Sequence, residues 1–174
     1  MNALVEILKI TIPAAAVFAA VYFLVKRFLD NDQKRREHQL KTSARAIITP
    51  LKIQAYERII IFLERINPNS LVIRVNKNNM TARQLHLDLV STIKSEFEHN
   101  LSQQIYISEG AWQFVKTAKE EIIQLINISS SKVTSDANSS DLAIMVLNIT
   151  ANLDKKLPSD AAIEFIKKEI AQTL

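Results

Sequence analysis

An uncharged apolar stretch near the start of the chain constrains its fold more than any other feature. Sixteen residues from Ile10 to Val25 carry no charge (ITIPAAAVFAAVYFLV), and Lys26 and Arg27 follow at once. Sixteen helical residues span about 24 Å, which is less than the roughly 30 Å of a bilayer core. A span over about residues 4–25 has the required length. We therefore predict a transmembrane anchor in residues 1–27.

Two other interpretations compete with the anchor. A cleaved signal peptide opens with a basic region, but the only early basic residue here is Lys9, and Glu6 precedes it. A helix buried in a soluble core is the second alternative. The positive residues follow the apolar stretch, so the positive-inside rule predicts an N-terminus outside and a C-terminal domain in the cytoplasm.

The positive charge of the chain is concentrated directly after the apolar stretch. The net charge is +4, and residues 26–45 carry seven basic against three acidic side chains, so the rest of the chain is neutral. An anionic lipid surface attracts such a strip by about 1 kcal/mol for each nearby Lys or Arg. A nucleic-acid-binding protein more often carries its positive charge on the folded domain, so we expect a membrane partner and no nucleic acid. The predicted basic patch at the membrane surface consists of Lys26, Arg27, Lys34, Arg35, Arg36, Lys41 and Arg45.

The composition excludes several classes of fold. The chain has a single glycine, Gly110, whereas phosphate-binding loops and tight hairpins require glycine. The absence of cysteine excludes thiol catalysis, cysteine-ligated zinc and disulfides. An apolar content of 48% with 6% aromatic residues suits helices that pack Leu, Ile and Ala. We predict an all-α fold: a transmembrane helix, a basic helical stalk and a cytoplasmic bundle of about five helices.

The stalk is expected over residues 28–49 and the cytoplasmic domain over residues 50–174. Apolar residues spaced by four, three and four run from the second half of the stalk into the domain, namely Leu40, Ala44, Ile47 and Leu51. This spacing fits a short coiled-coil seam, and we favour the alternative of a solvated stalk that leads into the core. Pro50 should kink or restart the helix.

Hydrophobic periodicity and capping signals locate the helices of the domain. Thr81 with Gln84 matches a capping box, Ser108 is an N-cap, and the Ser- and Asn-rich segment 129–140 reads as a loop. The segment 71–75 is β-prone and is expected to be an extended connector. The helices are expected at 51–66, from Thr81 to about Phe97, from Ser108 to about Ile126, at 141–153 and from Pro158 onward, with an ordered loop at 100–107.

No pattern of catalytic residues stands out. Glu96-x-x-His99 places a carboxylate and an imidazole one helical turn apart, but di-iron bundles need this motif twice together with two further glutamates. An ordinary surface or structural pair is the favoured interpretation. No nucleophile elbow and no HExxH motif occurs, so we expect no catalytic residue, no metal site and no cofactor. Trp112, the only tryptophan, is expected to be a buried anchor rather than an interface residue.

Two stretches carry a resemblance to a known family. Gln54-Ala-Tyr-Glu-Arg58 runs into Phe62-Leu-Glu-Arg65, and Glu96-Phe-Glu-His-Asn100 continues through Gln103-Gln-Ile-Tyr-Ile-Ser108 to Ala111-Trp112. Both resemble an uncharacterised family of small single-pass membrane-anchored helical proteins from Bacteroidota, over most of the chain. The resemblance implies a bacterial inner-membrane location and carries over no catalytic residue. Candidates for an interaction or structural site are Gln54, Glu57, Arg58, Glu96, His99, Asn100, Gln103, Gln104 and Trp112.

These observations lead to three hypotheses for the function. The first is a non-enzymatic, membrane-tethered scaffold or accessory subunit of an inner-membrane complex, with a protein partner and with homo-oligomers possible. The second is a ligand or metal site centred on Glu96, His99, Gln103 and Gln104. The third is a regulator that responds to anionic lipid through the basic patch.

Overall fold

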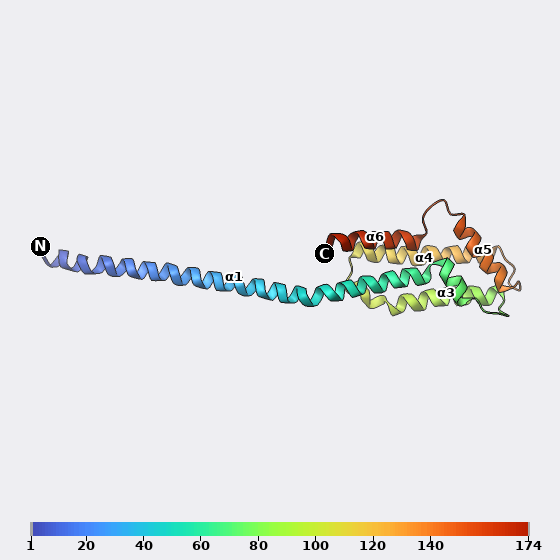
Figure 1. Ribbon diagram of the computed structural model, residues 1–174, viewed down its shortest axis with the longest axis horizontal. Coiled ribbons are helices and arrows are strands. Elements are labelled where there is room, and N and C mark those ends of the chain that lie inside the picture. The colour runs from blue at the N-terminus through green and yellow to red at the C-terminus, as the bar shows by residue number, and fades with distance from the viewer. Residues whose placement is uncertain (1, 174) are drawn as a thin grey trace. The chain divides into compact units, whose positions relative to one another are not determined.

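The computed structural model describes residues 2–173, and the side chains of 2–6, 8, 10, 11, 13, 14 and 173 lie outside the described part. Residues 2–173 form helices and no β-strand, which confirms the all-α fold; the one β-bridge found in them joins Thr81 to Asn138. The chain divides into two compact units, Met1–Thr49 (unit 1) and Pro50–Leu174 (unit 2). The helices are α1 (Asn2–Ile66), α2 (Pro68–Val75), α3 (Ala82–His99), the 3-10 helix η1 (Leu101–Ile105), α4 (Glu109–Ser131), α5 (Ser139–Ala151) and α6 (Pro158–Thr173) (Figure 1).

Helix α1 is longer than predicted because Pro50 does not restart it. The helix is continuous from Asn2 to Ile66. Proline lacks the N–H that would bond to the carbonyl of Ala46 one turn earlier. The side chains from residue 43 to residue 54 are exposed, so water can bond to that carbonyl and the helix continues.

The described part of the chain contains no helix with the length and apolarity needed to cross a membrane. This finding does not confirm the predicted transmembrane span. Several side chains of the expected span over residues 4–25 lie outside the described ones. Lys9 and Lys26 limit the uncharged stretch to sixteen residues.

Unit 2 is a helical bundle with one hydrophobic core. Helix α4 packs against α3, α5 and α6, and α2 packs against α3 and α5. The largest side chains that are fully buried are aliphatic apart from Phe62, as the scarcity of aromatic residues leads one to expect. They are Ile59, Phe62, Leu63, Ile66, Leu71, Leu85, Leu89, Ile93, Ile122, Ile126, Leu142 and Ile166.

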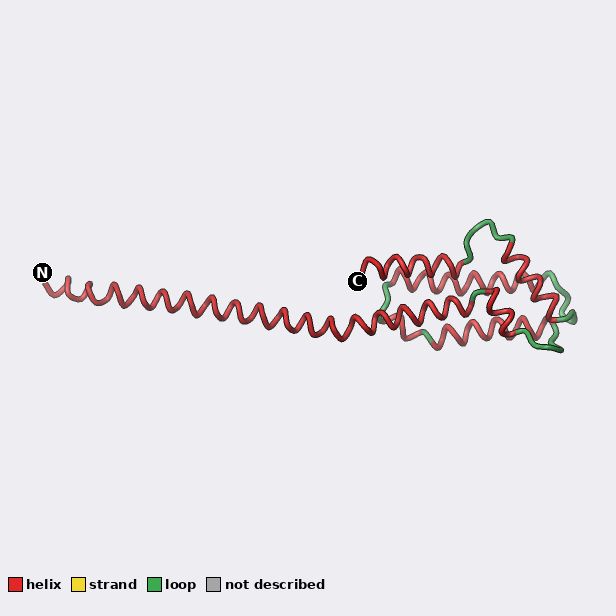
Figure 2. The backbone as a smooth tube through the Cα atoms, in the orientation of Figure 1, coloured by secondary structure: helices red, strands yellow, loops and turns green. Residues whose placement is uncertain are grey.

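Two loops of unit 2 lie side by side at one end of the bundle (Figure 2). The N–H of Ala82 donates to the carbonyl of Ala137 at 2.8 Å, and the N–H of Ser139 donates to the carbonyl of Met80 at 3.0 Å. The loop before α5 thereby positions the start of α3, and the loop before α3 positions the start of α5. The capping box of Thr81 and Gln84 is confirmed at the start of α3.

The prediction of an extended connector at 71–75 was wrong. This segment is the second half of α2, which begins with Pro68 after the N-cap Asn67. Leu71 and Val72 are buried, and burial of an i, i+1 pair on one side of a short helix outweighs the weak β preference of Leu-Val-Ile. The loop between α4 and α5 is also shorter than the predicted segment 129–140, because α4 continues to Ser131.

Candidate interaction site around Glu96

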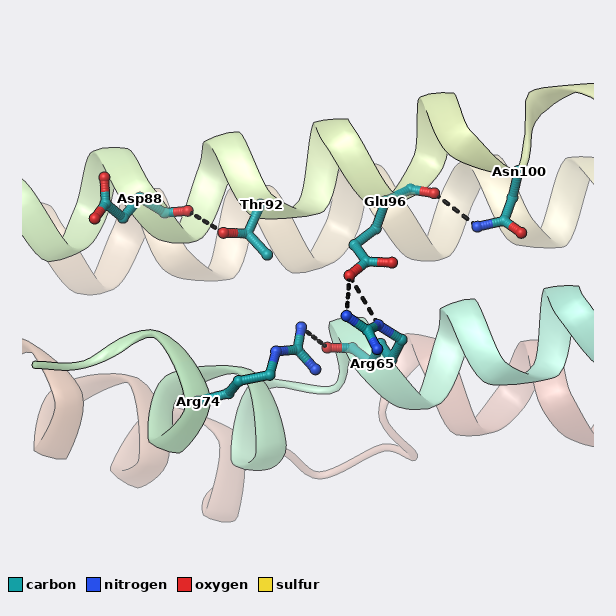
Figure 3. A network of polar contacts seen from close by, with 6 residues as sticks. All are labelled: Arg65, Arg74, Asp88, Thr92, Glu96 and Asn100. Carbon is teal, nitrogen blue, oxygen red and sulfur yellow. Dashed lines mark hydrogen bonds and ion pairs between the residues drawn. The ribbon is translucent and has the colours of Figure 1, made fainter.

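Glu96, three residues before the end of α3, forms an ion pair with Arg65 in the last turn of α1 (Figure 3). Nε of Arg65 lies 2.8 Å and Nη2 lies 2.5 Å from Oε1 of Glu96. The side chain of Arg65 is 48% exposed and that of Glu96 is 20% exposed. Solvent screens a pair with this exposure, so its contribution to stability is at most about 1 kcal/mol.

Two further side chains extend this contact into a network of three helices (Figure 3). Nη2 of Arg74 in α2 donates to the backbone carbonyl of Arg65 at 3.0 Å, and so satisfies a carbonyl at the end of α1. Nδ2 of Asn100 donates to the backbone carbonyl of Glu96 at 2.8 Å, at the end of α3. The network therefore holds the C-terminal ends of two helices and the short helix α2 together.

Arg65 and Glu96 line two shallow grooves. One groove, about 290 Å³ in volume, combines three cationic and two acidic side chains. The other has His99 and Ile61 on its walls. The charged residues of the first groove are Arg65, Arg74, Lys77, Asp88 and Glu96.

An aromatic cluster lies under the same part of α3. The rings of Phe97 and Trp112 are stacked with centroids 5.3 Å apart, and Phe62 lies 5.9 Å from Phe97. Nζ of Lys119 lies 4.3 Å from the centre of the Phe97 ring, a cation–π contact. Trp112 is 8% exposed, so it packs in the core.

Tyr56, Ser108 and Glu169 form a second polar cluster that joins three helices. The Tyr56 hydroxyl donates to one carboxylate oxygen of Glu169. Oγ of Ser108 donates to the other oxygen at 2.5 Å, while it accepts the N–H of Ala111 as the N-cap of α4. Burial, followed by the hydrogen bond and the negative charge of Glu169, raises the pKa of Tyr56 to about 12.

Sequence reasoning missed this cluster. The sequence identifies Ser108 as a cap, but it gave no reason to connect Tyr56 with Glu169. The capping signal was visible because it is local, within four residues. The partner of Tyr56 lies 113 residues away, and no spacing along the chain indicates such a contact.

The structure brings together only some of the candidate residues that the sequence indicated. Glu96 and Asn100 belong to the network with Arg65. His99 and Gln104 are exposed, and Nε2 of Gln103 donates to Oγ of Ser102 at 3.3 Å. The remaining polar candidates, Gln54, Glu57 and Arg58, are exposed on α1. Among the described residues no group of three or more His, Cys, Asp or Glu side chains has the geometry to hold a metal ion.

The predicted basic patch lies on α1 within unit 1. All seven of its side chains are exposed. Arg36 pairs with Asp32 one turn earlier, with Nη2 at 2.9 Å from Oδ2. The rest of the patch faces solvent.

Comparisons with known proteins identify a family. No curated protein and no solved structure matches the chain. The model of a family of unknown function, DUF7935, matches residues 2–173. This agrees with the expected membership of an uncharacterised family. Since the match extends over nearly the whole sequence, the chain belongs to the family of unknown function DUF7935.

Proposed function

We propose that the chain is a non-enzymatic scaffold or accessory subunit that its N-terminal segment holds at a membrane. Unit 2 is the interaction domain that it presents to a protein partner in a membrane complex. The resemblance to membrane-anchored proteins of Bacteroidota supports a bacterial inner-membrane location.

The observation that carries the proposal is the exposure of apolar side chains all around one helix. Every side chain from residue 15 to residue 30 is exposed, and from residue 15 to residue 25 no charged residue gives the helix a polar face. A helix that is apolar on all sides is stable only when a membrane or a partner covers it. The most exposed aromatic and aliphatic examples are Phe18 (74%), Leu24 (69%) and Phe28 (72%).

The charges after the apolar stretch support an orientation. Lys26 and Arg27 follow Val25 directly and are exposed. Short segments rich in Lys and Arg stay on the cytoplasmic side, so unit 2 is proposed to lie in the cytoplasm with the N-terminus outside.

The polar groups of unit 2 support a scaffold rather than an enzyme. Glu96 is paired with Arg65, and Glu169 accepts from both Tyr56 and Ser108. Carboxylates that are held in this way stabilise contacts between helices.

Membrane retention tests the tether. The full chain expressed in a bacterium is expected to stay in the membrane pellet after washes with high salt and with alkaline carbonate. The double variant Val17→Lys/Val21→Lys places two charges one turn apart in the apolar stretch, at a cost of about 3 kcal/mol each in a bilayer, and is expected to be released. Its matched control, Gln39→Lys/Ser43→Lys, adds the same charges outside the stretch and should be retained.

Crosslinking with mass spectrometry in native membranes tests the scaffold. Crosslinks from lysines of unit 2 to another membrane-complex protein are the expected result. A wild-type chain found wholly in the soluble fraction, or one that crosslinks to no protein, contradicts the proposal.

A second candidate function is ligand binding in the groove beside Glu96. The observation in its favour is the presence of Arg74, Lys77 and Asp88 around a groove of about 290 Å³. Opposite charges on one groove suit a zwitterionic ligand such as an amino acid. A panel of amino acids tested by thermal shift, with Asp88→Asn as the control, decides this point: no shift with any of them removes the candidate.

A further inference from the structure

The helix of unit 1 carries positive charges in a heptad pattern. Arg27, Lys34 and Lys41 are separated by seven residues each, and α1 is helical throughout this segment. Residues seven apart return to nearly the same face of a helix, about 10 Å further along its axis. We call these three exposed residues the basic stripe.

An apolar seam runs beside the C-terminal part of the basic stripe. It consists of Leu40, Ala44 and Ile47, which are spaced by four and three residues as d, a and d positions of a heptad. Leu40 is 71% and Ile47 is 68% exposed. In this register the basic stripe occupies the e positions, which flank the contact surface in a coiled coil. Gln33 and Glu37 occupy the preceding d and a positions, so the seam is apolar only over its last part.

Anionic lipid does not account for the whole stripe. In a chain tethered through the apolar stretch that ends at Val25, Lys41 lies sixteen residues further on. This distance is about 24 Å along a helix that leaves the bilayer. Electrostatic attraction is screened within about 8 Å at physiological salt. Lipid headgroups therefore explain Lys26 and Arg27 and leave Lys41 without a role.

A second copy of the chain does not match the stripe either. In a parallel pair the e positions meet the g positions of the other helix, which are Leu29, Arg36 and Ser43. None of these is acidic. In an antiparallel pair the e positions meet each other, so that positive charges face positive charges. Flanking charges of this kind select the partner and disfavour self-association.

We infer that Lys34 and Lys41 of the basic stripe, together with the apolar seam, bind a helix of a partner protein that carries carboxylates beside its own apolar seam. The inference rests on the proposed function, because it names the chemistry of the partner of the tethered scaffold. Among the described residues Arg36 is engaged by Asp32, whereas no ion pair joins Lys34 or Lys41 to a carboxylate. These two ammonium groups are available to a partner. The short seam makes the contact weak and dependent on salt.

A designed acidic helix serves as the probe. It is a labelled peptide of four heptads with Leu at the a and d positions and Glu at the e and g positions. Fluorescence anisotropy with the full chain in a mild non-ionic detergent is expected to detect binding that weakens as salt is raised. The variant Lys34→Glu/Lys41→Glu is expected to bind the peptide at least about tenfold more weakly.

Two controls separate the stripe from general electrostatics. Arg35→Glu/Arg45→Glu changes the net charge equally at f and b positions, which face away from the seam, and is expected to leave peptide binding unchanged. A basic peptide with Lys at the e and g positions is expected to bind Lys34→Glu/Lys41→Glu and not the wild type. This rescue shows that the variant is folded.

The outcomes distinguish this inference from its alternatives. No binding of the acidic peptide, or equal losses in both double variants, overturns it. Equal losses together with reduced binding to vesicles containing phosphatidylglycerol assign the charges to lipid instead. Membrane retention is measured separately, and Lys34→Glu/Lys41→Glu is expected to stay in the membrane pellet. A chain that binds the peptide but is soluble overturns the tether and leaves the helix contact standing.

Discussion

The hydroxyl of Tyr56 donates a hydrogen bond to the carboxylate of Glu169, which lies 113 residues further along the chain. This bond joins the C-terminal part of α1 to α6, the last helix of unit 2. Ser108 donates to the other oxygen of Glu169 at 2.5 Å. One carboxylate therefore fixes the first, fourth and last helices at a common point.

Replacing Tyr56 with Phe is expected to destabilise unit 2 by about 1–2 kcal/mol at pH 8. The change leaves the ring in the core and removes one hydrogen bond to a charged acceptor. Denaturant unfolding followed by the fluorescence of Trp112, the only tryptophan, measures the effect. An unfolding midpoint equal to that of the wild type contradicts a stabilising role for the bond.

The same pair predicts a loss of stability at high pH. The pKa of Tyr56 is about 12 in the folded chain, against 10.0 for an ordinary tyrosine. The folded state holds this proton more tightly than the unfolded state, so its contribution is complete below about pH 10 and is lost as the pH rises toward about 12. The stability difference between the wild type and Tyr56→Phe should therefore shrink toward zero in this window. Tyrosinate absorbance of the two proteins provides the check, since the component that ionises last must be missing in Tyr56→Phe.

The ion pair of Arg65 and Glu96 is expected to give a small coupling energy. A double-mutant cycle of Arg65→Ala and Glu96→Ala should yield about 0.5–1 kcal/mol, because solvent reaches both side chains. The coupling should fall when salt is raised to about 1 M, where screening acts within about 3 Å. A coupling above about 2 kcal/mol, or one that salt leaves unchanged, means that the pair is less exposed than its geometry indicates.

Local signals in the sequence predicted the helices well, whereas contacts between distant residues were not predictable. The capping box at Thr81 and the N-cap at Ser108 are each decided within four residues, and both are present. Helix α2 was missed because its short sequence favours strands in isolation, and only burial of Leu71 and Val72 against other helices makes it helical. The prediction that Pro50 kinks or restarts the helix was wrong, since a proline in an exposed helix removes only one hydrogen bond, which water replaces.

The candidate site shows the same division. Glu96 and His99 were a candidate pair of metal ligands because they lie one helical turn apart. The structure pairs Glu96 with Arg65 on another helix and leaves His99 exposed. Sequence spacing reveals which residues share a helix face, and it does not reveal which charge on a second helix meets them.

The aromatic cluster predicts a large effect for Phe97. Phe97→Ala removes the ring that stacks on Trp112 at 5.3 Å and holds the cation–π contact with Lys119. We expect a loss of about 3 kcal/mol from the cavity and the lost contacts. Ile105→Ala is the control, because that side chain is 76% exposed and should change stability by less than about 0.5 kcal/mol. Equal effects of the two variants on the Trp112 unfolding curve contradict the central position of Phe97.

The capping box at the start of α3 gives the most local test of the fold. Oγ1 of Thr81 accepts the N–H of Gln84 at 3.2 Å, and Oε1 of Gln84 accepts the N–H of Thr81 at 2.9 Å. Thr81→Ala removes one of these bonds and is expected to cost about 1 kcal/mol, while Thr81→Ser keeps it and should cost less than half as much. The nearby loop contact, in which the N–H of Ala82 donates to the carbonyl of Ala137, uses backbone groups that neither variant removes. Hydrogen exchange of the first turn of α3 should therefore accelerate in Thr81→Ala and not in Thr81→Ser. If both variants exchange at the wild-type rate, the loop contact alone positions the start of α3 and the capping box is dispensable.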